Sequence, residues 1–203
     1  MAKQIWKPNT LISPVPPTMV SCGTLEQPNI ITVAWTGIIN SNPPMTYVSL
    51  RPERFSHPII SQSGEFVINL TSKALVRAAD ICGVKSGRDM NKFEALSLTP
   101  APSSTVSAPL IGEAPISFEC KVVEVKQLGS HDMFLAKITA VQVDDSLIDK
   151  NGKLCLDRAE LVAYSHGEYF ALGEKLGSFG YSVRKKPGHA RAGSPRRHVR
   201  GKN

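Results

Sequence analysis

The sequence predicts a mainly β protein, in which antiparallel strands close into a barrel and two or three short helices cover it. Short runs of β-branched and aromatic residues recur between Asn, Gly and Pro residues, which is typical of strands joined by turns. Residues 116–143 show the clearest alternation of apolar and polar residues. Strands do not alternate with helices along the chain, so a doubly wound parallel sheet is not expected.

The first half of the chain contains four predicted strands. Thr18 to Gly23 forms the first, and the β-branched run from Ile30 to Val33 forms the second. That second run breaks at the segment Ala34-Trp35-Thr36-Gly37. After a turn rich in Asn and Pro, the runs Met45 to Leu50 and Glu65 to Leu70 supply two more strands.

The expected helices are short. Residues 56–62 form an amphipathic piece for which Ser56 is the predicted N-cap. Ser72 is the predicted N-cap of a helix from Lys73 to Cys82, whose apolar residues recur at helical spacing. A further short helix is expected at residues 90–95.

A long hairpin is the clearest feature of the second half. Residues 116–125 alternate, the turn lies at residues 128–132, and residues 133–143 return as the partner strand. One set of side chains is expected to face inward: Ile116, Phe118, Cys120 and Val122. The other set is expected to face outward: Ser117, Glu119 and Lys121.

The connecting segments also carry information. Residues 99–109 are a Pro/Ser-rich crossing, and such a loop in a compact domain usually covers something or reaches a partner. Further strand-like segments follow at residues 161–164 and 168–180. No internal repeat is visible.

Composition divides the chain into three parts. Residues 1–17 are Pro-rich and are expected to form an extended arm, and residues 18–183 form one domain. Residues 184–203 hold eight Lys/Arg and no Asp/Glu. Without them, the formal charge of +7 falls to −1, so the basicity belongs to this tail. We expect a disordered tail that folding and ligand binding do not require.

Cysteine spacing and hydropathy set the cellular context. The four cysteines form no C-x-x-C pair, so a zinc or iron–sulfur site is not expected, and buried free thiols in a reducing cytoplasm are favoured over disulfides. No signal peptide and no apolar segment long enough for a membrane span is visible. The cysteines are Cys22, Cys82, Cys120 and Cys155.

Two predicted strands end in residues suited to binding a ligand. The small residues Ala34, Thr36 and Gly37 let the backbone approach a flat ring closely. Ser49 and Arg51 suit a phosphate. Together they indicate a planar cofactor with a phosphorylated tail. Neither a G-x-G-x-x-G nor a Walker loop is present.

Five segments carry a resemblance to a known family. The sequence resembles the flavin reductase family of the FMN-binding split barrel, and is most similar to its flavoredoxin-type members. The similarity covers roughly residues 10 to 183. The order and spacing of the segments are more specific than any segment alone. They are NIITVAWTG, VSLRPERFSHPII, GEFVINL, SGRDMNKFE and HGEYFALGEKLGSFGYSV.

The resemblance implies an antiparallel split β-barrel of Greek-key type that binds FMN, with NADH or NADPH as a transient donor. It also implies a homodimer with the flavin near the subunit boundary. The chemistry then belongs to the flavin, and His131 is the one side chain placed near the nicotinamide. The implied FMN contacts are Ala34, Trp35, Thr36, Gly37, Ser49, Leu50, Arg51, Ser56, His57, Lys92 and Phe93.

Each assignment has a simpler alternative. The segment 34–37 can be a strand that ends in a turn, and Arg51 an exposed strand-end residue. Ser56 and His57 can serve only to cap a helix, although helix N-termini attract anions. Lys92 and His131 can be ordinary solvated side chains.

Two activities fit such a protein equally well. One is NAD(P)H-dependent flavin reduction, and the other is electron transfer by a carrier that a redox partner protein reduces. A nucleic-acid-binding β-barrel is a third, weaker hypothesis, because the near-neutral body has only 6% aromatic residues. No catalytic triad is indicated by the spacing of Ser, His and Asp.

Overall fold

The computed structural model describes residues 1–184, and its fold is mainly β, as predicted. Short β-branched and aromatic runs form the strands, in agreement with their intrinsic preference. The strands are β1 (Thr18–Gly23), β2 (Pro28–Val33), β3 (Thr36–Ser41), β4 (Pro44–Leu50), β5 (Glu65–Leu70), β6 (Pro100–Ala101), β7 (Leu110–Ile111), β8 (Ile116–Gln127), β9 (Asp132–Val143), β10 (Val162–Ser165) and β11 (Glu168–Ala171).

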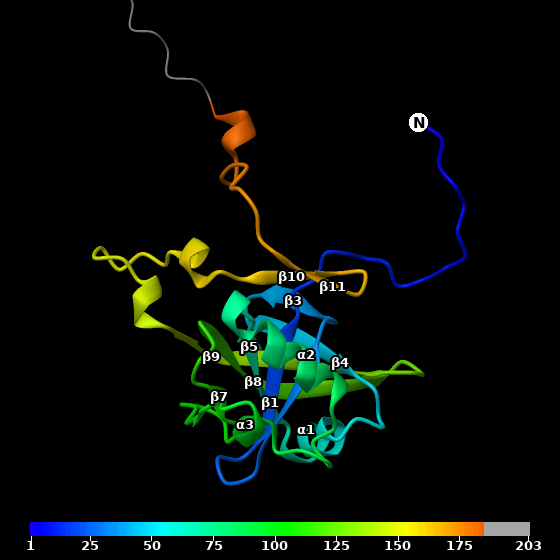
Figure 1. The fold of residues 1–203 in the computed structure, drawn as a ribbon, viewed down its shortest axis with the longest axis vertical. Coiled ribbons are helices and arrows are strands. Elements are labelled where there is room, and N and C mark those ends of the chain that lie inside the picture. The colour runs from blue at the N-terminus through cyan, green and yellow to red at the C-terminus, as the bar shows by residue number, and fades with distance from the viewer. Residues whose placement is uncertain (185–203) are drawn as a thin grey trace, which may run out of the picture. The chain divides into compact units, whose positions relative to one another are not determined.

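The helices are short and lie in the connections between strands (Figure 1). The α-helices are α1 (Ser56–Ser63), α2 (Val76–Val84) and α3 (Lys92–Ala95). Single turns of 3₁₀ helix are formed by Lys73–Leu75, Asp145–Leu147, Leu156–Ala159 and Tyr181–Val183.

Seven strands form one antiparallel sheet in the order β2-β1-β5-β8-β9-β4-β3. Its two outermost strands, β2 and β3, are consecutive in the chain and are joined through Ala34 and Trp35 alone. The Ser49 amide of β4 donates a hydrogen bond to the Trp35 carbonyl oxygen (3.0 Å). This joint therefore brings the ends of β2 and β4 together at one place, which positions the candidate site.

Alternation along the strands divides the core into two layers. On β1, Val20 and Cys22 face the interior of the barrel, where they belong to one core cluster with Phe66 of β5 and Phe134 of β9. Met19 points to the opposite face and packs beneath α2 and α3 with the following residues: Ile30, Leu75, Ala79, Cys82, Phe93, Leu98 and Ile111. Helix α2 thus covers the outer face of β1 and β2 (Figure 1).

Three expected elements differ in detail. The segment after Val33 is not only a turn, because Thr36–Ser41 continues as β3, paired with β4. Residues 73–75 form a 3₁₀ turn before α2, and the side chain of Ser72 makes no capping hydrogen bond. Ser56 is likewise no N-cap, since it is already helical and its hydroxyl accepts a hydrogen bond from Asn29.

The prediction that Ser117, Glu119 and Lys121 face outward was partly wrong. Lys121 is exposed, but Ser117 and Glu119 are buried. The reason is that the crossing at residues 99–109 lies over this part of β8. Two of its residues, Ser104 and Thr105, donate hydrogen bonds to the Glu119 carboxylate.

The chain divides after Leu172 into the units Met1–Leu172 and Gly173–Asn203. The arm at residues 1–17 has no helix, and its one sheet-like contact is a bridge between Val15 and Tyr164. Of the predicted basic tail, residues 185–203 lie outside the described part. Among the described residues, no helix has the length and apolar character to cross a membrane. All four cysteines are free thiols, and three of them are buried.

Candidate functional site

A cavity of about 380 Å³ opens where β2 and β4 end, within the first unit. Four parts of the chain form most of its walls. They are the ends of β2 and β4, the C-terminal half of α2, the loop after β4, and the β10–β11 hairpin. The lining residues are Pro17, Ile31, Thr32, Val33, Ala34, Trp35, Ser49, Leu50, Arg51, Arg54, Asp80, Gly83, Val84, His131, Tyr164, Gly167 and Tyr169.

A second cavity of about 310 Å³ adjoins the first, and both are lined by Ile31 and Arg54. It lies between α1 and the segment that follows α2. Its lining is rich in cationic and hydroxyl side chains: Ile31, Glu53, Arg54, Phe55, Ser56, Cys82, Lys85, Ser86, Gly87, Arg88 and Lys92. The two cavities together make a site with one mixed apolar end and one cationic end.

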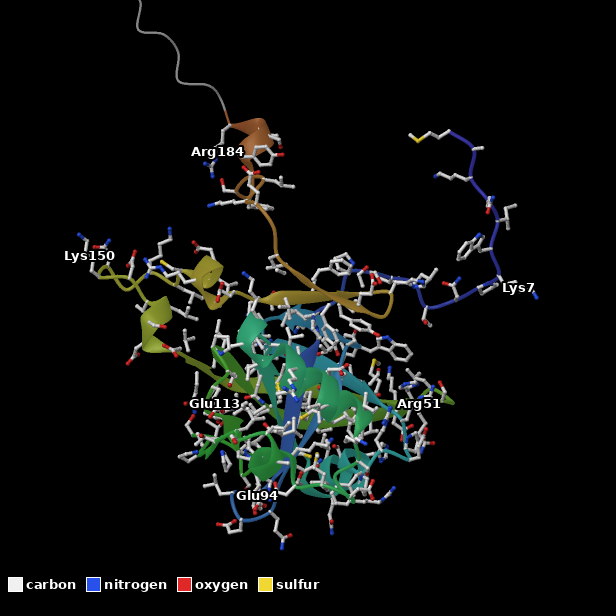
Figure 2. The ribbon with its side chains drawn as sticks, viewed as in Figure 1. Lys7, Arg51, Glu94, Glu113, Lys150 and Arg184 are labelled. Carbon is white, nitrogen blue, oxygen red and sulfur yellow. The ribbon has the colours of Figure 1, made fainter. Side chains whose placement is uncertain are left out.

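The arginine loop, residues 51–55, connects β4 to α1 and contributes to both cavities. Arg51 begins the loop at the end of β4 (Figure 2), and its side chain is half exposed, 3.5 Å from Glu53. The Arg54 amide donates to the Arg51 carbonyl oxygen (3.1 Å), which folds the loop into a turn. Both Arg51 and Arg54 line the first cavity.

Trp35 and His131 form the rim of the first cavity. Their ring centroids are 4.4 Å apart, and Trp35 is 42% exposed. Burial, followed by the nearby positive charge of Arg51, lowers the pKa of His131 below its usual value. Both causes favour the neutral form of the imidazole over the charged form.

Close packing shapes the wall of the second cavity at Gly87. A Cβ on this residue would lie 2.2 Å from the Asn29 side chain and 2.5 Å from the Phe55 ring. Only a glycine lets the segment 86–88 approach the arginine loop this closely. The guanidinium of Arg88 lies 5.8 Å from the centre of the same Phe55 ring.

Lys92 is not the solvated lysine of the simpler alternative. It is buried at the start of α3, and its ammonium donates to the Ile30 carbonyl (2.7 Å) and the Cys82 carbonyl (2.9 Å). Burial lowers its pKa. An ammonium has three donors, so one remains for a ligand in the second cavity, which Lys92 also lines.

The structure brings eight of the twelve predicted residues to the two cavities. Ala34, Trp35, Ser49, Leu50, Arg51 and His131 line the first, and Ser56 and Lys92 line the second.

The other four lie elsewhere. Thr36 and Gly37 line a separate apolar cavity of about 170 Å³, and the Thr36 hydroxyl donates to the Tyr47 carbonyl (2.6 Å). His57 is bonded to Asp132 (2.8 Å), and Phe93 is part of the core under α2.

Sequence reasoning missed several lining residues. Arg54 stands in the same RPER segment as Arg51, so a count of cations in that segment would have found it. The β10–β11 hairpin contributes Tyr164 and Tyr169 from far along the chain. No sequence pattern near these residues predicts that they line the cavity. The Tyr169 hydroxyl donates to Asp80 (3.4 Å), and burial together with that carboxylate raises the pKa of Tyr169 to about 12.

This geometry suits a flat, partly apolar ligand with an anionic tail. Aromatic side chains and strand ends line the first cavity together with Arg51, and Arg54 stands where it adjoins the second cavity. Arginine forks match the oxygens of a phosphate, whereas the described residues contain no cluster of His, Cys, Asp or Glu that could hold a metal ion.

Comparisons with known proteins agree with this picture. Residues 12–173 match the model of the flavin reductase like domain. The flavoredoxin of Desulfovibrio vulgaris (Miyazaki F) is similar, with 34% identity, a TM-score of 0.83 and coverage of 90% of this chain and 100% of its own.

Two further solved structures share the fold. A putative flavin reductase with a split barrel domain from Shewanella frigidimarina is 26% identical, with a TM-score of 0.75 over 85% of this chain and 89% of its own. An FMN-binding protein from Thermus thermophilus is 24% identical, with a TM-score of 0.72 over 88% and 98%. The chain is thus an antiparallel split barrel, and it belongs to the flavin reductase like domain family.

Proposed function

We propose that this protein binds FMN across the two cavities and uses it to transfer reducing equivalents. The observation that carries the proposal is the pair of arginines at the first cavity of about 380 Å³: Arg51 lines this cavity, and Arg54 lines both it and the adjoining cationic cavity. Flavin binding is the property of the family, and one protein with the same fold is an FMN-binding protein. FMN has one planar ring system and one phosphate, which matches one wide cavity and one cationic end.

The residues divide by the part of the cofactor that they would hold. The backbone at Ala34 and Trp35 would border the ring, with Ser49 and Leu50 beside it. Arg51 and the neighbouring cations would hold the phosphate. No contact with the cofactor is proposed for Thr36, because it lines a separate cavity and its hydroxyl proton is used on a main-chain carbonyl.

Bound flavin supplies the hydride or electron chemistry, and the protein supplies orientation and exclusion of water. The rings of His131 and Trp35 pack together and line the first cavity, and we propose that a nicotinamide would approach the flavin beside them. The β10–β11 hairpin covers the other side with Tyr164 and Tyr169. Few side chains need to move protons, and none is assigned a general acid or base role.

The donor is proposed to be NADH or NADPH, which makes the protein a flavin reductase. The alternative is an electron carrier reduced by a partner protein, and the 34% identity to a flavoredoxin favours it. Steady-state assays with NADH and NADPH separate the two. Turnover with either nucleotide supports the reductase, whereas bound flavin that neither nucleotide reduces supports the carrier.

Flavin binding itself is tested by titration. Apo-protein is titrated with FMN, FAD and riboflavin while flavin fluorescence is followed. We expect the tightest binding for FMN, because riboflavin lacks the phosphate and FAD carries a bulky second nucleotide. Protein that binds none of the three contradicts the proposal. A nucleic-acid-binding barrel would give this result, together with a salt-dependent shift of an oligonucleotide.

The protein is also proposed to act as a cytoplasmic homodimer. Three features suggest contact with a second subunit, because a single barrel has little use for them. They are the exposed apolar strand β3, the Pro-rich arm and the crossing at residues 99–109. Light scattering should report twice the mass of 22.0 kDa. A monomer that binds FMN fully would end this part of the proposal without affecting the flavin site.

A further inference from the structure

We propose that Asp132 is a positioning residue, which holds the arginine loop in place through His57. This inference rests on the proposed FMN site, because it concerns how Arg51 and Arg54 are kept ready for a phosphate. Asp132 touches neither cavity, since it lines neither of them. Its side chain would therefore act on a ligand indirectly, and we propose that the arginine loop carries this effect.

The two ends of the arginine loop meet at Asp132. Leu50, the last residue of β4, stands opposite Asp132 in the β4–β9 pairing. The chain then leaves the sheet through residues 51–55 and enters α1, where His57 lies in the first turn. The His57 Nε2 atom returns to within 2.8 Å of Asp132 Oδ2. One residue of β9 thus fixes both where the loop begins and where it ends.

The contact is shielded from water, which makes it stronger than an exposed one. The side chains of His57 and Asp132 are 16% and 11% exposed. The Phe134 ring packs edge-on against the imidazole, with centroids 5.1 Å apart. A carboxylate can only accept, so the imidazole N–H is the donor and its ring orientation is set.

The other described contacts of the loop are weaker constraints. The Arg54 amide bonds to Arg51 and the His57 amide bonds to Arg54, but these bonds are local and would move with the loop. The contact between Arg51 and Glu53 is exposed and also lies within the loop. Phe55, the last residue of the loop, packs beside Gly87 and lies near the guanidinium of Arg88, and these contacts join it to another loop rather than to the sheet. Among the described residues, two polar contacts link the start of α1 to the sheet: His57 to Asp132 of β9, and the Ser56 hydroxyl to the Asn29 amide of β2 (2.7 Å). Of the two, the His57 contact joins a titratable side chain to the strand residue that stands opposite the start of the loop.

A loosened loop should affect ligands unequally. The ring end of the site is built on β2 and β4, which the sheet holds without help from His57. The phosphate end is built on the loop. Loss of the tie should therefore weaken a phosphorylated flavin and leave the unphosphorylated one nearly unchanged. A general loss of packing would weaken both.

The experiment compares FMN and riboflavin affinity of full-length Asp132→Ala with those of the parent protein. We expect FMN to bind about tenfold more weakly, the equivalent of one charge-assisted contact, and riboflavin to change by less than about twofold. Lys73→Gln is the matched control: it removes an exposed ion pair between two other segments and should change neither ligand. Equal weakening of both flavins, or no change in either, overturns the proposal.

A second arm tests whether the effect passes through the arginines. In a background of Arg51→Ala and Arg54→Ala, Asp132→Ala should weaken FMN no further. An undiminished tenfold loss there overturns the proposal. His57→Gln, whose amide can still donate to Asp132, should retain part of the FMN affinity, and it serves as the readout if Asp132→Ala does not fold.

Failure of this inference is distinct from failure of the proposed function. A parent protein that binds no flavin contradicts the FMN site itself and overturns the inference with it. A parent protein that prefers FMN to riboflavin, with an unchanged preference in Asp132→Ala and His57→Gln, supports the site and overturns the role of Asp132 alone.

Discussion

Two buried carboxylates on neighbouring strands, Glu119 of β8 and Asp132 of β9, each hold a loop against the sheet, but they do so differently. Glu119 is fully buried and accepts five hydrogen bonds. Four come from backbone and hydroxyl groups of Ser104 and Thr105 in the crossing, and one comes from Gln142. Asp132 has one side-chain partner, His57.

The difference separates a loop that supports stability from a loop that supports binding. In the crossing, the amides and hydroxyls of Ser104 and Thr105 donate to the carboxylate of Glu119, so few hydrogen-bond donors of this segment remain for a ligand. The arginine loop is held at its end, and both of its arginines line the first cavity; the one charged partner of Arg51, Glu53, lies within the loop and is exposed. Variants of each loop should accordingly change different quantities: the free energy of unfolding for the crossing, and flavin affinity for the arginine loop.

The largest effect is expected for Glu119→Ala. Its removal takes away the acceptor shared by donors of Ser104, Thr105 and Gln142. A fully buried unsatisfied group costs about 1–3 kcal/mol, but Ser104 and Thr105 are exposed, so water can replace part of what they lose. Some relaxation and water entry will occur, so we expect a loss of about 3 kcal/mol in the free energy of unfolding. Urea denaturation monitored by circular dichroism measures it. Folded Glu119→Ala should bind FMN as the parent does, and a selective loss of FMN affinity would blur the distinction between the two loops.

Acid unfolding tests the same carboxylate. Burial alone would raise the pKa of Glu119, but the hydrogen bonds from Ser104, Thr105 and Gln142 together lower it from 4.5 to about 2. A depressed pKa contributes stability that is present above 4.5 and lost as the pH falls toward 2. The parent should therefore lose more stability than Glu119→Gln over this pH range. Parallel losses in the two proteins would show that Glu119 is not ionised by this network.

Arg51→Ala tests the other loop. The lost contact with phosphate is charge-assisted and worth about 1.5–3 kcal/mol, so the FMN dissociation constant should rise roughly tenfold to a hundredfold. Riboflavin should bind the variant and the parent alike. Arg51→Lys should recover part of the loss, since an ammonium keeps the charge without the fork. Fluorescence titration distinguishes the outcomes: equal weakening of both flavins assigns Arg51 to the shape of the cavity, and no change makes it a surface residue.

A smaller effect is expected for Thr105→Val. The hydroxyl of Thr105 donates to Glu119 (2.6 Å) and contacts Thr139, whereas the Thr105 amide remains in the variant. One lost hydrogen bond should lower the free energy of unfolding by about 1 kcal/mol. Thr10→Val, in the exposed arm, is the control and should have no measurable effect. A loss as large as that of Glu119→Ala would mean that the network has no redundancy.

The smallest effect is a shift in the titration of His131. Its pKa should lie below 6.5 in the ligand-free protein, because burial and the charge of Arg51 both oppose protonation. Arg51→Ala should raise this pKa without restoring the usual value, since burial is the larger cause. NMR titration of the imidazole protons measures both values. If Arg51→Ala leaves the titration midpoint of His131 unchanged, the Arg51 guanidinium does not lie close enough to His131 to affect its protonation.

Most strands could be predicted because each is a short β-branched or aromatic run between turn residues. β3 could not, since its sequence TGIINS contains residues that also favour turns, and only pairing with β4 makes it a strand. The burial of Glu119 could not be predicted from the sequence for a related reason. Alternation predicts which face a side chain takes, but the loop that covers that face comes from a segment 14 to 15 residues away in the chain.

The candidate site was predictable where binding residues stand at strand ends. Ala34, Trp35 and Arg51 follow directly from such positions. His57 did not, because its neighbour in space, Asp132, is 75 residues away. A polar residue near a helix start suggests an anion site, whereas the structure uses this one to bind a carboxylate of the protein itself.

The outermost strand β3 has a consequence for handling the protein. It pairs with β4 on one side, and its residues Ile38 and Ile39 are 69% and 44% exposed. A free strand edge with apolar side chains is a template on which another chain can add, and natural proteins usually protect such edges with charges or a cover. β3 itself contains no charged residue. An edge of this kind favours aggregation at high protein concentration, and Ile38→Lys is expected to reduce it.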